Sequence, residues 1–104
     1  MPHVNFIEWH VHAFRAERWL EIWAPALDRA LAFGAASCYL TRSVDDPLHF
    51  RQVSVWEDQG DFERYWLSPE LVALREDSIN YYNKPLLPEW HSVTLDASPV
   101  EAAG

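Results

Sequence analysis

The 104-residue sequence contains a single cysteine, Cys38, and only three glycines. One cysteine excludes an intramolecular disulfide and a cysteine zinc cluster. Three glycines leave no glycine-rich loop for a phosphate or a dinucleotide. We find no apolar run approaching 18 residues and no charged-then-apolar leader, so we expect neither a membrane span nor a secretory signal. These deficits favour a cytoplasmic protein with no membrane partner.

Basic residues are scarce as well. Lys and Arg total 8 against 16 Asp and Glu, which gives a net charge of -8. A field of this sign repels the phosphates of nucleic acids and anionic lipids, so we expect no nucleic-acid partner. Aromatic residues, in contrast, are plentiful, with six tryptophans in this short chain. Because a small core rarely needs so much aromatic surface, we expect part of it to line an interface or a pocket.

The first element is predicted to be a strand over residues 3–12, "HVNFIEWHVH". Side chains two apart share one face of a strand. One face therefore carries Asn5, Ile7 and Trp9, and the other carries Glu8, His10 and His12. Because neither face is simply polar, we expect both to be covered at least in part.

Helical periodicity follows from residue 16 to residue 33, and its phase holds across Pro25. We therefore predict one helix bent at the proline, with Gly34 as the left-handed residue that ends it. Two strands are predicted over residues 36–42 and 49–57, because both segments are rich in aromatic and β-branched residues. A short helix is then predicted over residues 57–66, "EDQGDFERYW". A second helix is predicted to begin at Ser68 and Pro69 and to run to about Tyr82. The last predicted strand covers residues 90–95.

The resulting order is β-α-β-β-α-β, which predicts a ferredoxin-like α+β fold: an antiparallel sheet with two helices on one face. We predict one domain over residues 1–95 and a flexible tail over residues 96–104. Such a sheet leaves its second face bare, and we expect Phe6, Leu40 and Trp56 on that face beside the Glu8, His10 and His12 row. The simplest cover is a second copy of the chain, so we predict a homodimer.

Two segments carry a resemblance to a known family: "VSVWEDQGDFERYWLSPEL" (residues 53–71) and "VNFIEW" (residues 4–9). Together with the element order, the chain resembles the antibiotic-biosynthesis-monooxygenase-like superfamily of dimeric α+β barrels over roughly residues 3–95. The resemblance implies a homodimer whose sheets form a shared barrel, with a ligand pocket between sheet and helices in each subunit. Its members include cofactor-free oxygenases of aromatic polyketides, haem-degrading oxygenases and isomerases.

The same resemblance implies roles for individual residues. In the oxygenase members, an asparagine on the first strand and a tryptophan on the helix after the third strand help define the pocket. Asn5 matches the first, and Tyr65 or Trp66 matches the second. The haem-degrading members place a histidine ligand on the second helix, and no histidine occurs between Gln59 and Tyr82. This departure argues against haem degradation, and we expect no cofactor.

Several aromatic side chains are expected to lie around Asn5. One interpretation is a pocket for a planar, hydrophobic ligand, oriented by the buried amide. The other is that these side chains simply fill the core. We favour the pocket, with Asn5, Tyr65 and Trp66 as catalytic candidates and a ligand-binding group made of Ile7, Trp9, Trp19 and Trp23.

The polar row on the opposite face also has two interpretations. His-x-His with a carboxylate two residues earlier is a metal spacing, which His49 or His91 on other strands could complete. The alternative is a hydrogen-bonded lining of the barrel. We favour the lining, formed by Glu8, His10, His12 and His91, with no metal. Three functions stay open: a cofactor-independent monooxygenase or isomerase, a non-catalytic binder of a small aromatic ligand, and a metal-dependent enzyme at Glu8, His10 and His12.

Overall fold

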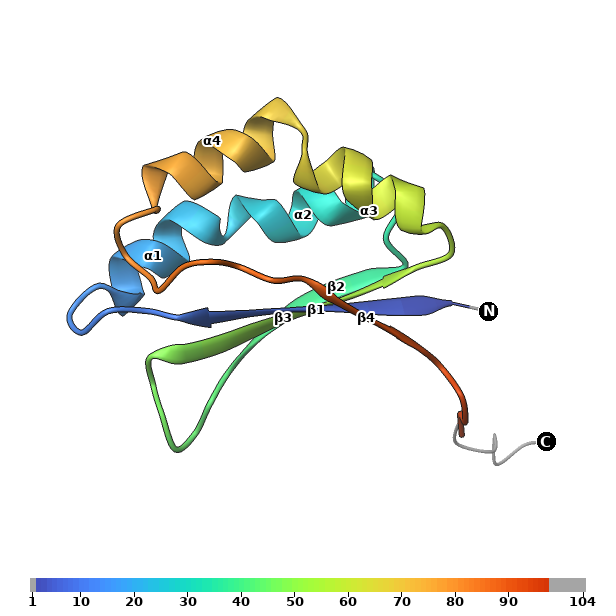
Figure 1. Cartoon of the computed structure of the whole chain (residues 1–104), viewed down its shortest axis with the longest axis horizontal. Coiled ribbons are helices and arrows are strands. Elements are labelled where there is room, and N and C mark those ends of the chain that lie inside the picture. The colour runs from blue at the N-terminus through green and yellow to red at the C-terminus, as the bar shows by residue number, and fades with distance from the viewer. Residues whose placement is uncertain (1, 98–104) are drawn as a thin grey trace, which may run out of the picture.

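The computed structural model describes residues 2–97 and shows one antiparallel sheet with every helix on the same side of it (Figure 1). The strand order is β2-β3-β1-β4, with β1 at His3–His10, β2 at Ser37–Arg42, β3 at His49–Trp56 and β4 at Glu89–Ser92. The helices are α1 (Ala16–Trp23), α2 (Pro25–Ala32), α3 (Gln59–Trp66) and α4 (Pro69–Asp77). This arrangement confirms the ferredoxin-like α+β fold. Within residues 2–97, no helix combines the length and apolarity needed to cross a membrane.

The first helical segment is divided at Ala24 into α1 and α2, so the prediction of one helix bent at the proline is wrong, although the helical residues begin and end within one residue of the predicted bounds. Ala24 keeps helical dihedral angles between α1 and α2, and Pro25 occupies the first position of α2, where the lack of an N–H removes no helical hydrogen bond. Gly34 ends the segment with φ at 112°. The N–H of Gly34 donates to the Leu31 carbonyl, and the N–H of Ala35 donates to the Ala30 carbonyl, the paired bonds of a Schellman end.

The second helical segment is capped at each start. The Asp58 carboxylate accepts from the Gly60 N–H at 2.8 Å, and the Ser68 hydroxyl accepts from the Leu71 N–H. α4 ends at Asp77, so the prediction that it continues to about Tyr82 is wrong. The chain instead turns back along β1, where the N–H of His12 donates to the Tyr81 carbonyl and the N–H of Asn83 donates to the His10 carbonyl. These bonds occupy backbone groups that β4 is too short to reach.

The helix-facing side of β1 carries Asn5, Ile7 and Trp9, all wholly buried, as the alternation predicted. The core between sheet and helices is mostly aromatic. Trp9 lies 5.1 Å from Trp19 and 5.0 Å from Trp23, measured between ring centroids. Aromatic side chains bury large areas and favour tilted contacts at such distances, so they fix the spacing between sheet and helices.

The side of the sheet away from the helices, here called the open face, lies bare in Figure 1. Its residues alternate with the helix-facing ones and comprise Val4, Phe6, Glu8, His10, Tyr39, His49, Arg51, Val53, Val55, Glu89 and His91. The prediction that Leu40 and Trp56 share this face is wrong. Leu40 pairs with the buried Gln52, and Trp56 is wholly buried 5.6 Å from Phe62 of α3. The pairing of β2 with β3, which local sequence does not encode, sets this alternation.

The elements from His3 to Ser92 share one core. The predicted domain of residues 1–95 and the predicted tail of residues 96–104 stay predictions. Asp96 and Ala97 have no regular secondary structure, and residues 98–104 lie outside the described part of the chain.

Candidate functional site

Asn5 lies at the middle of the sheet, on β1 between Ser54 of β3 and Trp90 of β4. The side chain is wholly buried. Neither its Nδ2 nor its Oδ1 has a hydrogen-bond partner among residues 2–97. A buried polar group without a partner destabilises a protein by about 1–3 kcal/mol, so such groups are rare and call for an explanation. Asn5 is therefore an amide with its full hydrogen-bonding capacity unused.

The predicted ligand-binding group lies on this same side of the sheet. Ile7, Trp9, Trp19 and Trp23 are all wholly buried, and the three tryptophan rings pack together between β1 and α1. The indole Nε1 of Trp9 and that of Trp19 find no hydrogen-bond acceptor within the described residues. Trp23 differs, because its Nε1 donates to the Gln52 side-chain oxygen at 2.8 Å. The structure thus brings the predicted residues together as packed side chains, two of them with unpaired donors.

Tyr65 belongs to a hydrogen-bond chain that crosses the core. Gln52 Nε2 donates to the Tyr65 hydroxyl at 3.2 Å, and that hydroxyl donates to the Ala26 carbonyl at 2.8 Å. Burial raises the pKa of Tyr65, so the phenol stays protonated at neutral pH. The arrangement ties β3 to α2 and α3 and leaves no group of Tyr65 free for proton transfer.

Trp66 sits next to Tyr65 but is only half-buried. Its ring lies 6.1 Å from Trp23 and 5.7 Å from Phe62, with the Arg75 guanidinium 4.1 Å from its centroid. Trp66 therefore contacts the Trp23 ring directly. Tyr65 is connected to Trp23 through hydrogen bonds that both make with Gln52. Phe62 continues this aromatic row to Trp90, at 5.3 Å, and Trp90 lies beside Asn5.

The sequence analysis did not single out Gln52, Ser54, Phe62, Arg75 and Trp90. A local signal existed for Gln52 and Ser54, because they lie between the apolar Phe50 and Trp56 on the same face of β3. Polar side chains in an otherwise apolar alternation indicate a buried polar network. Trp90 becomes a neighbour of Asn5 only through the pairing of the first strand with the last.

The open face carries a cavity of about 570 Å³. Its apolar lining residues are Val4, Phe6, Pro85 and Leu87, and its charged and titratable lining residues are Glu8, His10, Arg51, Glu89 and His91. Three of the four predicted barrel-lining residues, Glu8, His10 and His91, thus border one cavity. Asn5 lines neither this cavity nor the smaller one at the β2–β3 end of the sheet.

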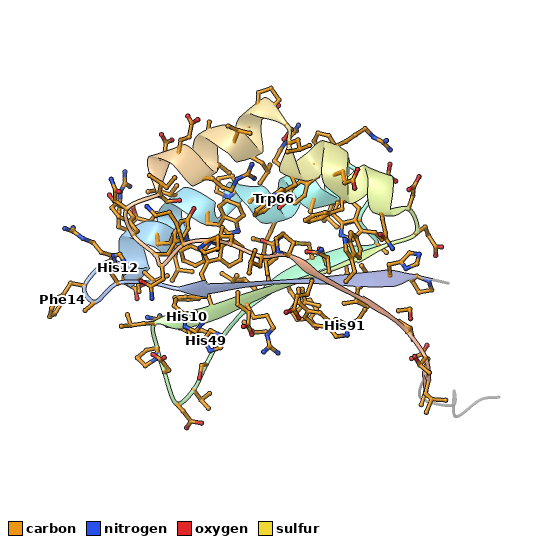
Figure 2. All side chains as sticks on the ribbon, viewed as in Figure 1. His10, His12, Phe14, His49, Trp66 and His91 are labelled. Atoms are coloured by element: carbon orange, nitrogen blue, oxygen red, sulfur yellow. The ribbon has the colours of Figure 1, made fainter. Side chains whose placement is uncertain are left out.

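His12 does not share this surface, contrary to the predicted row of three. β1 ends at His10, and the alternation of faces stops where the strand stops. The His12 Nε2 lies 3.0 Å from the Asn83 side-chain oxygen, and Figure 2 shows His12 well separated from His10 and His49. The place expected for His12 is taken by His49, which pairs with His10 across β1 and β3.

The polar cluster on the open face has a defined electrostatic order. The Arg51 Nε donates to Glu8 Oε1 at 2.9 Å, and Arg51 holds the pKa of Glu8 below its usual value. His49 Nε2 lies 3.5 Å from the same carboxylate oxygen. The His10 and His49 rings are stacked, with centroids 4.5 Å apart and planes 12° from parallel. Glu8 is therefore ionised at neutral pH and faces a cation and two imidazoles.

Solved structures with this fold extend over nearly the whole chain. The structure is similar to a candidate antibiotic biosynthesis monooxygenase from Nitrosomonas europaea, with a TM-score of 0.83, 13% identity, and 93% of this chain and 94% of that chain covered. It is also similar to Rv0793 from Mycobacterium tuberculosis, with a TM-score of 0.80, 13% identity, and 94% and 100% covered.

A third similar structure is an asparagine-to-alanine mutant of SnoaB, a cofactor-independent oxygenase from Streptomyces nogalater. Its TM-score is 0.78 at 14% identity, with 91% of this chain and 95% of that chain covered. No protein-family profile and no curated protein sequence matches the chain. The chain thus has the fold of the antibiotic-biosynthesis-monooxygenase-like superfamily, which confirms the predicted resemblance at the level of fold.

Proposed function

We propose that this chain is a homodimeric, cofactor-independent monooxygenase that acts on a planar aromatic metabolite bound beside Asn5. The observation that carries the proposal is the wholly buried Asn5 amide with neither polar atom paired within residues 2–97. A ligand carbonyl oxygen could accept from Asn5 Nδ2, and a ligand hydroxyl could donate to Asn5 Oδ1. The fold shared with SnoaB, a cofactor-independent oxygenase, supports the reaction class.

The reaction needs little from the protein beyond orientation and a dry site. An activated CH2 group between aromatic rings, once deprotonated, reduces O2 itself. One oxygen atom becomes the new carbonyl oxygen, and the other leaves as water with the two hydrogens of the CH2. Orientation of the substrate and exclusion of water are then the main contributions to the rate. Asn5 would orient the substrate oxygen next to the reacting carbon.

Access to Asn5 is proposed at the β4 edge of the core. Trp9, Trp19 and Trp23 are wholly buried, so a ligand cannot enter past them without unpacking α1. Trp90 lies directly beside Asn5, is only half-buried, and belongs to a four-residue edge strand. Displacement of Trp90 from Phe62 would open a path that leaves the tryptophan cluster intact.

A second candidate function is binding of the same ligand without turnover. The core between sheet and helices contains Tyr65 and Tyr82, with Cys38 packed against it, and burial raises the pKa of each. No carboxylate or histidine of the described residues is wholly buried. The described residues therefore place no ready general base in the core to deprotonate the substrate. This observation favours binding without turnover for any substrate that does not lose its proton to solvent.

The homodimer is proposed to form through the open face. Val4, Phe6 and Tyr39 form an apolar surface there, with the nearly buried Val53 between Phe6 and Tyr39. A contiguous apolar surface on a sheet face favours burial against another protein. Two such faces would be expected to bury on the order of 2,000 Å² or more, the range of an obligate dimer.

The experiment is a thermal-shift screen with hydroxylated polycyclic aromatic compounds, followed by tryptophan fluorescence and O2 consumption with each hit. Asn5→Ala should weaken binding by about 1–3 kcal/mol and lower turnover further, because orientation is lost as well as affinity. Asn80→Ala, at an exposed asparagine, is the matched control. Binding without O2 consumption would contradict the monooxygenase and support the non-catalytic binding protein. An Asn5→Ala variant altered in stability alone would show that Asn5 is only a core residue.

A further inference from the structure

Three side chains of the types that can ligate a metal meet on the open face from two adjacent strands. Glu8 and His10 stand on β1, and His49 stands opposite His10 on β3. The carboxylate oxygen and the two imidazole nitrogens that they offer all lie within 4.8 Å of one another. Figure 2 shows His10 and His49 together on the side of the sheet away from the helices. The set is separate from the Asn5 core, which lies on the other side.

The distances fit a small tetrahedral ion. Bonds of about 2.0–2.1 Å at the tetrahedral angle place two ligand atoms about 3.4 Å apart. The Glu8 Oε1 to His49 Nε2 distance is 3.5 Å. The Nε2 of His49 is shielded from solvent and has no hydrogen-bond partner within the described residues. An unpaired, shielded nitrogen beside an ionised carboxylate is a ligand pair already at the required separation.

We propose that Glu8, His10 and His49 bind a divalent transition metal of the zinc class. Two imidazoles and one carboxylate are a donor set that suits zinc and iron(II), and the absence of a thiolate argues against softer ions. The sequence analysis favoured a hydrogen-bonded barrel lining over a metal, and it named His49 or His91 as residues that could complete a site. In the structure His49, and not His12, lies with Glu8 and His10, so the set of three ligand atoms is different from the predicted row.

Two rearrangements accompany binding. The nitrogen lone pairs of an imidazole lie in the ring plane, so two stacked rings cannot both point at one ion until one of them rotates. His10 is exposed and lies at the end of β1, and it is the ring free to turn. Arg51 must also release Glu8. Both partners of that ion pair are about half exposed, and such pairs stabilise a protein little.

Three protein ligands leave the fourth tetrahedral position for water or a ligand atom. Glu8 and His10 both line the 570 Å³ cavity, so the open position would face it. A metal with an open position can polarise a carbonyl oxygen or acidify a bound water. The inferred site is thus a Lewis-acid site for a small oxygen-containing ligand. It does not depend on the reaction proposed for the Asn5 core, and it lies on the same open face as the proposed dimer interface.

The test is zinc titration by calorimetry at pH 7.5 on the full chain, after removal of any polyhistidine tag and treatment with a chelator. The expected result is one equivalent of Zn²⁺ per chain. His10→Ala and His49→Ala should each lower the affinity at least about tenfold, since even residues that only support metal ligands contribute tenfold or more. His12→Ala, which removes the histidine that the structure places elsewhere, should leave it unchanged.

Two further measurements make the test sharper. Arg51→Ala should tighten zinc binding, because it frees the Glu8 carboxylate, whereas adventitious binding at a distant histidine would not respond. Substitution with Co²⁺ should give the strong visible absorption of a tetrahedral site and lose it in His49→Ala. The absence of stoichiometric binding, or binding that survives His49→Ala and is lost in His12→Ala or His91→Ala, would overturn the proposal. Circular dichroism of each variant checks that it is folded.

Discussion

The indole nitrogen of Trp23 on α1 donates to the side-chain oxygen of Gln52 on β3 at 2.8 Å, in the middle of an otherwise apolar layer. Gln52 donates in turn to Tyr65, so one glutamine serves two aromatic residues from two helices. A buried polar network of this kind stabilises only when every member is paired.

Loss of the Gln52 amide should therefore destabilise the fold. Gln52→Leu leaves the Trp23 N–H without an acceptor, and we expect the free energy of unfolding to fall by about 1–3 kcal/mol. Tyr65→Phe removes only the bond to the Ala26 carbonyl and the acceptor for Gln52, and we expect a loss of about 1 kcal/mol. Urea denaturation measures both. A Gln52→Leu variant as stable as the parent would show that the network contributes nothing.

Asn5 should behave in the opposite way. Because its amide is buried without a partner, Asn5→Leu removes an unsatisfied group and adds apolar volume of similar shape. We expect the free energy of unfolding without ligand to stay equal or rise by about 1 kcal/mol, while ligand binding is lost. Urea denaturation and fluorescence titration measure the two effects. A marked loss of stability would indicate that Asn5 has a structural partner, and it would contradict the ligand proposal.

Cys38 should be chemically inert in the folded protein. Burial raises the pKa of the thiol to about 12, so almost no thiolate exists at pH 8. We expect a disulfide reagent to react at least about a hundredfold more slowly with the native protein than with the urea-unfolded chain. The sign of the shift also means that this cysteine favours folding below pH 9 and that its contribution disappears as the pH rises toward 12. Fast native labelling at pH 8 would contradict this.

The proposed dimer should be sensitive to charge on the open face. Phe6→Glu would place a carboxylate in the buried centre of the interface, where an unpaired charge is strongly unfavourable. We expect sedimentation of this variant to report a folded monomer at micromolar concentration. Leu67→Glu changes an exposed apolar residue on the helix side, is 69% exposed before the change, and should leave the dimer intact. A parent protein that sediments as a monomer would refute the dimer directly.

Local patterns in the sequence were sufficient to predict most of the fold. The period-two alternation placed Asn5, Ile7 and Trp9 on the buried side of β1, and the helical phase predicted helical residues on both sides of Pro25 with an end at Gly34. The Ser68 cap and Pro69 marked a helix start because capping depends on residues within a few positions of each other. Each of these features rests on short-range geometry.

What the sequence could not predict depends on strand pairing. The position of His49 opposite His10 follows from the register of β1 with β3, and so does the burial of Trp56. No local signal fixes a register between strands separated by about forty residues, because the pairing is decided by packing of the whole sheet. The row of Glu8, His10 and His12 failed for a related reason, since the strand ended before His12.

The pairing of β1 with both β3 and β4 also sets an order of events in time. His3 pairs with Trp56 on one side and Ser92 on the other, so β1 acquires both neighbours only after the chain has been made as far as β4. The helices can form from nearby residues, but the sheet must close long loops before it gains its contacts. During synthesis, Asn5 and Phe6 therefore lack their β4 neighbours until the residues around Trp90 emerge. The residues of the proposed ligand site are among the last to be assembled.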